Sequence, residues 1–285
     1  MVIRIFPTGK SAFDAEPSFR SGSTRIGAVQ YLNTKPLVYG LGSQGVGVSY
    51  DLPSRLADQL AQGQLHVALI PSIELFRRDR YQVVSDACIG CRGPVMSVKL
   101  FFRTAPHRVR RLAVDEGSRT SATLSRILLA ERCGVMPSVE VLPIGSQLAD
   151  TSADAILLIG DRAIGAQGGS FQLVWDLGDE WCRWTGLPFV FAIWAAHRDF
   201  STRTVAPLLA AARDSGIANL AGIAAVEAAR HGLTVPQCLS YLQDNLHFKI
   251  GPPERDALSL FYERAAALSL APTGIDVRRT LAYLA

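Results

Sequence analysis

Short apolar runs alternate with amphipathic segments through the first third of the chain. The runs have the length of strands and lie at Ile26–Val29, Val46–Tyr50, Val67–Ile70 and Tyr81–Ser85. The segments between them predict short helices at Leu37–Gly42, Pro53–Leu60 and Ile73–Arg78. Strands that alternate with helices in this way predict a mostly parallel sheet covered on both faces.

Two longer β-prone runs, Val95–Phe102 and Leu187–Ala195, enclose a second block of the same kind. This block contains expected strands at Arg111–Val114, Val139–Leu142 and Ala155–Ile159 and a helix at Ala122–Cys133. The rest of the chain predicts helices at about 204–215, 217–230, 236–245, 253–267 and 275–284. The chain is therefore expected to leave one lobe, build a second and return, with both long runs as hinge strands.

The pattern as a whole predicts an α/β fold with a ligand cleft between two lobes. Residues 25–102 and 196–285 are assigned to lobe 1, and residues 103–195 to lobe 2. Residues 1–24 are expected to form a flexible N-terminal extension. Open α/β sheets bind ligands beyond the carboxyl ends of their strands, so such a cleft suits a small polar ligand.

Charge and hydropathy narrow the classes of partner. The net charge of +4 comes from 29 basic and 25 acidic residues that are scattered along the chain, which argues against a nucleic-acid partner. No apolar run reaches the roughly 18 residues of a membrane span, so no membrane partner is expected. The first 24 residues lack the pattern of a secretory signal, and a cytoplasmic location is the expectation.

The cysteines and tryptophans can each be interpreted as structural residues or as parts of a functional site. Cys88 and Cys91 form a C-x-x-C pair, but no second ligand pair matches it, so structural thiols are favoured over a metal or redox site. Trp181, Trp184 and Trp194 could cover a ring-shaped ligand, although core packing is favoured. No metal and no organic cofactor is predicted, because the familiar nucleotide, hydrolase and metal motifs are missing from the sequence.

The first candidate corner follows the run Ile26–Val29. Pro36 suits the first position of a helix, which would leave Asn33, Thr34 and Lys35 at the mouth of the corner. A carboxamide, a hydroxyl and a cation together suit an anionic ligand. An ordinary turn with a solvated lysine is an equally weighted alternative.

The second corner lies at the start of the helix expected at Ala122–Cys133. Gly117 permits a tight turn, and the residues after it, Ser118, Arg119, Thr120 and Ser121, offer hydroxyls and a guanidinium beside free helix N–H groups. These residues would cap the helix in any case. Their number favours an anion site in addition.

Two further corners carry weaker signals. Asp161 follows the run Ala155–Ile159 and either hydrogen-bonds a substrate hydroxyl or, as is favoured, caps a helix that begins near Ala163. Ser72 is a candidate ligand contact after Val67–Ile70, whereas Glu74 is expected to be a solvated carboxylate in the first helical turn.

Several motifs together resemble a known family. They are residues 26–37, IGAVQYLNTKPL; residues 67–71, VALIP; residues 93–98, GPVMSV; residues 118–121, SRTS; residues 157–161, LLIGD; and residues 184–190, WTGLPFV. In these the chain is similar to the chorismate dehydratases of the futalosine route to menaquinone. The resemblance implies the two-lobed fold of type II periplasmic binding proteins. It also implies removal of water from chorismate, a dicarboxylate, to give 3-[(1-carboxyvinyl)oxy]benzoate without a metal or cofactor.

The resemblance also implies roles for single residues. Asn33 matches the family's active-site asparagine and would orient the substrate, while the enolpyruvyl carboxylate of the substrate takes the ring proton. Substrate-binding roles are expected for Tyr31, Thr34, Ser72, Ser118, Arg119, Thr120, Ser121 and Asp161. A non-catalytic solute-binding protein or sensor of the same fold is the alternative. The oligomeric state is open, with a homodimer as one alternative.

Overall fold

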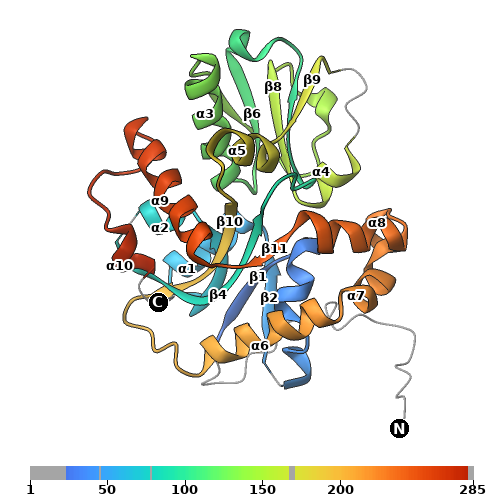
Figure 1. The fold of residues 1–285 in the computed structure, drawn as a ribbon, viewed down its shortest axis with the longest axis vertical. Helices are drawn as coiled ribbons and strands as arrows, with labels where there is room; N and C mark the ends of the chain where they lie inside the picture. Colours follow the sequence, from blue (N-terminus) through green and yellow to red (C-terminus); the bar gives the residue numbers. More distant parts are fainter. Residues whose placement is uncertain (1–23, 45, 78, 167–170, 282–285) are drawn as a thin grey trace.

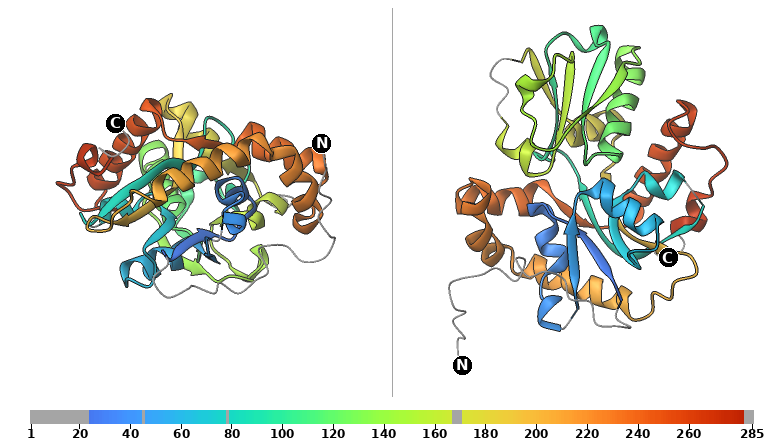
Figure 2. Two further views of the ribbon diagram at one scale, coloured as in Figure 1. Left: turned by 90° about the horizontal axis from the view of Figure 1, so that it is seen from below. Right: turned by 180° about the vertical axis from the view of Figure 1, so that it is seen from behind.

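Two β-sheets organise the structure, a computed structural model that describes residues 24–44, 46–77, 79–166 and 171–281. Each sheet forms the centre of one lobe, and the lobes are joined near the middle of the molecule (Figure 1). A view from behind shows the same division (Figure 2). The predicted N-terminal extension, apart from Thr24, lies outside the described residues.

The first sheet has the strand order β11-β4-β10-β3-β1-β2. Its strands are β1 (Ile26–Val29), β2 (Val48–Asp51), β3 (Val67–Pro71), β4 (Tyr81–Cys91), β10 (Phe189–His197) and β11 (His247–Lys249). β1 is parallel to β2 and β3, but β10 is antiparallel to both β3 and β4. β1 to β4 thus all run in one direction, as expected, but the returning β10 runs against them and inserts between β3 and β4, so the sheet is mixed.

The second sheet has the order β7-β6-β8-β5-β9. Its strands are β5 (Val98–Phe102), β6 (Arg111–Asp115), β7 (Ser138–Leu142), β8 (Ala155–Ile159) and β9 (Leu173–Asp176). The described part of this lobe contains the α-helices α3 (Thr120–Cys133), α4 (Asp161–Gly165) and α5 (Leu177–Thr185). The hydrophobic pattern did not predict β9 or α5.

The chain changes sheets at 92–97 and at 186–188. β4 ends at Cys91 in the first sheet, and β5 pairs with β8 and β9 in the second. β10 lies wholly in the first sheet. Neither long run is thus a strand shared by both lobes, and the boundaries predicted at 102/103 and 195/196 do not coincide with the changes of sheet.

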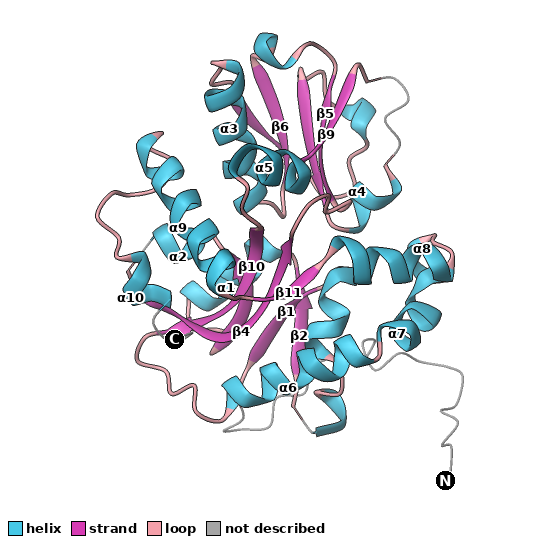
Figure 3. Ribbon diagram, viewed as in Figure 1, coloured by secondary structure: helices cyan, strands magenta, loops and turns pink. Residues whose placement is uncertain are grey.

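Helices cover the first sheet on both sides. Figure 3 shows them in cyan beside the magenta strands. They are α1 (Pro53–Ala61), α2 (Glu74–Arg77), α6 (Val205–Ala218), α7 (Leu220–Glu227), α8 (Val235–Ser240), α9 (Pro252–Ala267) and α10 (Val277–Leu281). Short 3₁₀ or π turns include η1 (Leu32–Val38), η5 (Ala228–His231) and η6 (Tyr241–Asn245), with the remainder at 42–44, 106–108 and 148–150. The five helices predicted after residue 200 are confirmed within a few residues at each end, apart from the part of the last one beyond residue 281.

Trp181, Trp194 and both cysteines of the C-x-x-C pair are buried. Trp181 and Trp194 are fully buried, and Trp181 meets Phe189 and Phe261 edge to face, so these tryptophans belong to the core. Cys88 and Cys91 are buried in β4, and burial raises the pKa of the Cys88 thiol. Within the described residues, no helix has the length and apolar character to span a bilayer.

Candidate active site between the lobes

A cavity lies where the strand ends of the two lobes face each other. Its lining residues are Val29, Tyr31, Asn33, Pro53, Pro71, Ile89, Val95, Ser97, Val98, Gly117, Ser118, Arg119, Thr120, Ser121, Ile159, Gly160, Phe191 and Ala192. Of the predicted site residues, Tyr31, Asn33 and the run 118–121 are brought together here. Thr34, Ser72 and Asp161 are not among the lining residues.

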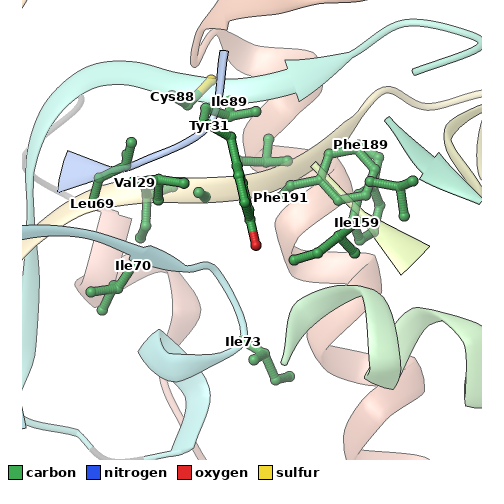
Figure 4. Packing of buried hydrophobic residues seen from close by; sticks show 14 of the residues in the cluster. Val29, Tyr31, Leu69, Ile70, Ile73, Cys88, Ile89, Ile159, Phe189 and Phe191 are labelled. Carbon is green, nitrogen blue, oxygen red and sulfur yellow. The ribbon is translucent and has the colours of Figure 1, made fainter. Parts of the chain in front are cut away.

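Tyr31 crosses from the first lobe into the second. Its ring occupies the place of a side chain at Gly160, since a Cβ atom there would lie 2.6 Å from the ring. A Cβ atom at Gly117 would lie 3.1 Å from the Tyr31 hydroxyl. Figure 4 shows the ring among apolar side chains that include Ile89, Ile159 and Phe191. The two glycines thus admit one aromatic side chain between the second-lobe corners.

Two hydroxyls at the cavity lack protein partners. The Tyr31 hydroxyl and the Ser118 Oγ are buried and make no hydrogen bond within the described part of the chain. Burial, reinforced by Asp115 and Asp161, raises the pKa of Tyr31, so this phenol stays protonated. Buried polar groups without partners are costly, and a polar ligand would satisfy both.

The cavity also receives the N-terminus of α3. This helix has Arg119 as its N-cap residue and no side-chain cap, so the predicted capping by hydroxyls is wrong. The Thr120 Oγ1 instead accepts a hydrogen bond from the Ile73 N–H at 3.2 Å, across the lobes. The first N–H groups of a helix have no intrahelical partner, and they favour an anion.

Asn33 lies inside η1 rather than in a loop before a helix. The Thr34 N–H already bonds to the Tyr31 carbonyl at 3.1 Å, which places Pro36 within the 3₁₀ turn instead of at its first position. The Thr34 hydroxyl donates to the Asn33 Oδ1 at 3.4 Å. The Asn33 side chain can therefore offer its amide N–H groups to a ligand, beside the Tyr241 hydroxyl that they also face.

Lys35 does not act as a cation at the mouth of the cleft. Its ammonium pairs with Glu227 of α7 at 3.5 Å, and its side chain is only 12% exposed. Both the predicted ligand contact and the alternative of a solvated lysine are wrong. Burial lowers the pKa of Lys35, against the raising effect of Glu227.

Arg119 reaches the cavity, but its charge is already paired. The guanidinium contacts Asp58 of α1 at 2.7 Å and Glu74 at 3.3 Å. Burial works against the charged form, yet these two carboxylates raise the pKa of Arg119. Glu74 is buried and also pairs with Arg77, which corrects the expectation of a solvated carboxylate. Arg119 thus links the lobes as well as facing the cavity.

The side chains of Ser72 and Asp161 hydrogen-bond to backbone groups of the protein and do not line the cavity. The Ser72 hydroxyl is fully buried and donates to the Val190 carbonyl at 2.7 Å. The Asp161 Oδ1 accepts from the Leu32 N–H at 3.0 Å, and its Oδ2 lies 3.2 Å from the Nδ1 of His231. Asp161 lies in the first turn of α4, but its side chain points to the other lobe rather than capping its own helix.

Sequence reasoning missed several residues at or beside the cavity. Ser97 and Phe191 line it, and the Tyr241 hydroxyl faces Asn33 and Ser97. Ser97 lies in the motif 93–98, which is a signal that could have indicated it. Phe191 comes from an apolar strand and Tyr241 from a mixed polar and apolar helical segment, and neither pattern indicates more than burial.

The fold and the cavity define a two-lobed protein of the periplasmic-binding-protein type. Protein AF1704 from Archaeoglobus fulgidus has a similar structure, with a TM-score of 0.71 and 18% identity, over 88% of this chain and all of that one. The aliphatic sulphonate binding protein SsuA from Escherichia coli has a TM-score of 0.59 and 16% identity, over 91% of each chain. At these identities the likeness shows the fold alone.

Sequence comparison places the chain more narrowly. A family model described as menaquinone biosynthesis matches residues 24–267. A chorismate dehydratase from Thermus thermophilus is 32% identical over 266 residues, which are 87% of this chain and 96% of that protein. The chain therefore belongs to this menaquinone-biosynthesis family, and the resemblance inferred from the motifs is confirmed.

Proposed function

We propose that the protein is a chorismate dehydratase that converts chorismate into 3-[(1-carboxyvinyl)oxy]benzoate for menaquinone biosynthesis. Family membership and the chorismate dehydratase relative support this activity. The observation that carries it is the meeting of Asn33, the buried Tyr31 and Ser118 hydroxyls and the start of α3 in one cavity. That combination suits a ring that bears anionic groups.

Different parts of the cavity wall suit different parts of chorismate. Its apolar walls, among them Val29, Ile89 and Phe191, suit the ring. The N–H groups at the start of α3 and the Ser118 hydroxyl suit a carboxylate. The paired Arg119 contributes positive potential without a free charge. Asn33 then donates to the substrate and fixes its orientation.

The elimination needs an acceptor for one ring proton. A ring C–H bond and the ring C–OH bond break, a new ring double bond forms, and the proton and hydroxyl leave as water. The described lining residues include no His, Asp, Glu or Lys, and a general base must lie within hydrogen-bond reach of its proton. The family resemblance implies that the enolpyruvyl carboxylate of the substrate takes this proton, and the described lining agrees with that role. The protein then supplies orientation.

The test follows chorismate by mass spectrometry in the presence of the wild-type protein, Asn33→Leu and Asn219→Leu. Wild type and the exposed Asn219→Leu control should give a product lighter by one water. Asn33→Leu should lose turnover by about 100-fold or more, as expected for a donor that acts in the transition state. Near-normal turnover in Asn33→Leu would disprove the role of this residue.

The same samples decide between catalysis and binding. Chorismate that stays intact yet raises the melting temperature of the wild-type protein would replace the dehydratase by a solute-binding protein or sensor, the class to which the sulphonate-binding neighbours belong. Chorismate that neither reacts nor binds would refute both the dehydratase and a binding protein for chorismate.

A further inference from the structure

A line of alternating charges lies behind Asn33, outside the cavity. The Asp161 Oδ2 lies 3.2 Å from His231 Nδ1, and the His231 Nε2 lies 3.5 Å from the Glu227 carboxylate. The same Glu227 carboxylate lies 3.5 Å from the Lys35 ammonium. We call Asp161, His231, Glu227 and Lys35 the anchor chain.

Both ends of the anchor chain hold the turn that carries Asn33. At one end the Asp161 Oδ1 accepts the N–H of Leu32, the residue directly before Asn33, at 3.0 Å. At the other end Lys35, two residues after Asn33, pairs with Glu227. The backbone on each side of the Asn33 carboxamide is thus tied to one connected set of charges.

The charges of the anchor chain are sheltered and depend on one another. The side chains of Glu227, Lys35 and His231 are 4%, 12% and 14% exposed, and that of Asp161 is 29% exposed. Sheltered charges are tolerated when each has partners of opposite sign. Both ring nitrogens of His231 face carboxylates, so both carry protons, and the hydrogen bonds to Asp161 and Glu227 raise the pKa of His231 to about 9.

The anchor chain also joins the two lobes. Asp161 is in α4 beside the second sheet, whereas Lys35, Glu227 and His231 belong to η1, α7 and η5 around the first. The contact between Asp161 and the first-lobe groups therefore exists only while the lobes are together. None of the four residues lines the cavity.

We propose that His231 and Asp161 are positioning residues, which hold η1 so that the Asn33 carboxamide points at the substrate when the lobes meet. The proposal rests on the dehydratase function for its kinetic consequence. It also makes a structural claim, the fixing of the Leu32 N–H, that does not depend on any reaction.

Other charges near His231 do not replace its role. Arg230 of η5 lies 3.7 Å from Glu227, and Arg162 of α4 is bound to Asp115. Burial, together with Glu227 and Asp161, raises the pKa of the Cys238 thiol in α8, so this thiol stays uncharged. Facing His231 directly are the carboxylates of Asp161 and Glu227, so an uncharged residue in its place leaves both without this cation.

The kinetic test compares wild type with His231→Gln, His231→Lys and Asp161→Asn, and uses the exposed His107→Gln as the matched control. A turn displaced by about 1 Å can cost up to about 100-fold in rate, so His231→Gln and Asp161→Asn should lower kcat by about 10- to 100-fold and change KM by less than about threefold. His231→Lys, which keeps a cation, should recover part of the loss, and His107→Gln should match wild type.

The pH profile separates positioning from general weakening of the fold. The imidazolium is present below a pKa of about 9 and is lost as the pH rises through it. The kcat of wild type should therefore fall above about pH 9, whereas that of His231→Gln should stay low and level from pH 7 to 10. Profiles of the same shape, or kcat values within twofold of wild type, would overturn the proposal.

Amide hydrogen exchange at Leu32 tests the structural claim by itself. Exchange should be at least about tenfold faster in His231→Gln and Asp161→Asn than in wild type and His107→Gln, because a lost hydrogen bond lowers the local opening free energy. If wild type left chorismate intact, the dehydratase function would fail, and this exchange would still decide the structural claim. Unchanged exchange in both variants would overturn it.

Discussion

At the scale of single residues, Tyr31 and Gly160 form a matched pair. Gly160 has a φ of 61°, a region that suits glycine, and the Tyr31 ring fills the space that a Cβ atom would need. The position thus demands glycine twice, once for the backbone and once for the space that the ring fills.

Replacing Gly160 by alanine should disturb both requirements. The added Cβ would lie 2.6 Å from the Tyr31 ring, so the ring must move. We expect a loss of about 1–3 kcal/mol in the free energy of unfolding and a higher KM for chorismate. Urea unfolding and steady-state kinetics measure the two effects.

Gly165 in the same helix provides the control, because a Cβ atom there would meet nothing within 4 Å. Gly165→Ala should leave the KM for chorismate unchanged. Equal unfolding free energies and equal KM values for the two variants would show that the contact between Tyr31 and Gly160 carries no weight.

The sequence pattern predicted which residues lie at the cavity better than it predicted their ion-pair partners. Asn33 was found because it follows an apolar strand, and the run 118–121 because it precedes a helix. The states of Lys35 and Arg119 were not predictable, since their partners Glu227 and Asp58 lie far away in the chain and only folding brings them close. For the same reason, nothing in the local sequence indicated that His231 would face Asp161.

At the scale of elements, the crossing at 92–97 depends on one carboxylate. Asp176 accepts hydrogen bonds from the Val95 N–H at 2.9 Å and the Met96 N–H at 2.6 Å. It also caps α5 through the N–H groups of Gly178 and Asp179 at 3.0 and 3.1 Å. Met96 has a φ of 64°, so this side chain helps to hold an unfavourable turn.

Asp176→Ala should therefore destabilise more than the loss of an ordinary cap. It would leave four N–H groups without this acceptor, with an expected loss of about 2–4 kcal/mol in the free energy of unfolding. Urea unfolding is the measurement. Asp179→Ala removes the same kind of side chain one turn along α5, where it pairs with the exposed Arg183, and should change little. Similar losses in both variants would contradict the special role of Asp176.

Local pattern predicted most elements of the first lobe but not their order in the sheet. Strand-length runs and Pro or Gly boundaries report local conformation. They predicted β1, β3 and α1, which the structure confirms. The insertion of β10 between β3 and β4 is a long-range pairing that no local pattern encodes. The apolar Val95 makes the run 95–102 look like one strand, although hydrogen bonds to Asp176 hold a turn at Val95 and Met96.

At the scale of the whole molecule, ion pairs on the surface join the lobes around the cavity. Arg55 of α1 contacts Glu116 at 2.9 Å, and Asp58 of the same helix contacts Arg119 at 2.7 Å. Arg55 and Asp58 have more than half of their side-chain area exposed, so salt screens both pairs. Their attraction favours the arrangement in which the second-lobe corner faces η1.

The double variant Arg55→Gln and Asp58→Asn should open the molecule while every lining residue stays in place, and Arg119 keeps Glu74 as its ion-pair partner. Exposed pairs contribute little individually, so the KM for chorismate should rise by a factor of about two to five. Small-angle X-ray scattering without ligand should give a larger radius of gyration than wild type.

Added salt and a control variant test whether these ion pairs cause the changes in radius of gyration and KM. In wild type, added salt should move both the radius of gyration and KM toward the values of the double variant, because it screens the same charges. Arg183→Gln breaks an exposed pair with Asp179 inside α5 and should leave both quantities unchanged. A double variant that scatters and turns over like wild type at low salt would mean that the buried links, Thr120 to Ile73 and Asp161 to Leu32, keep the lobes together without help from surface charge.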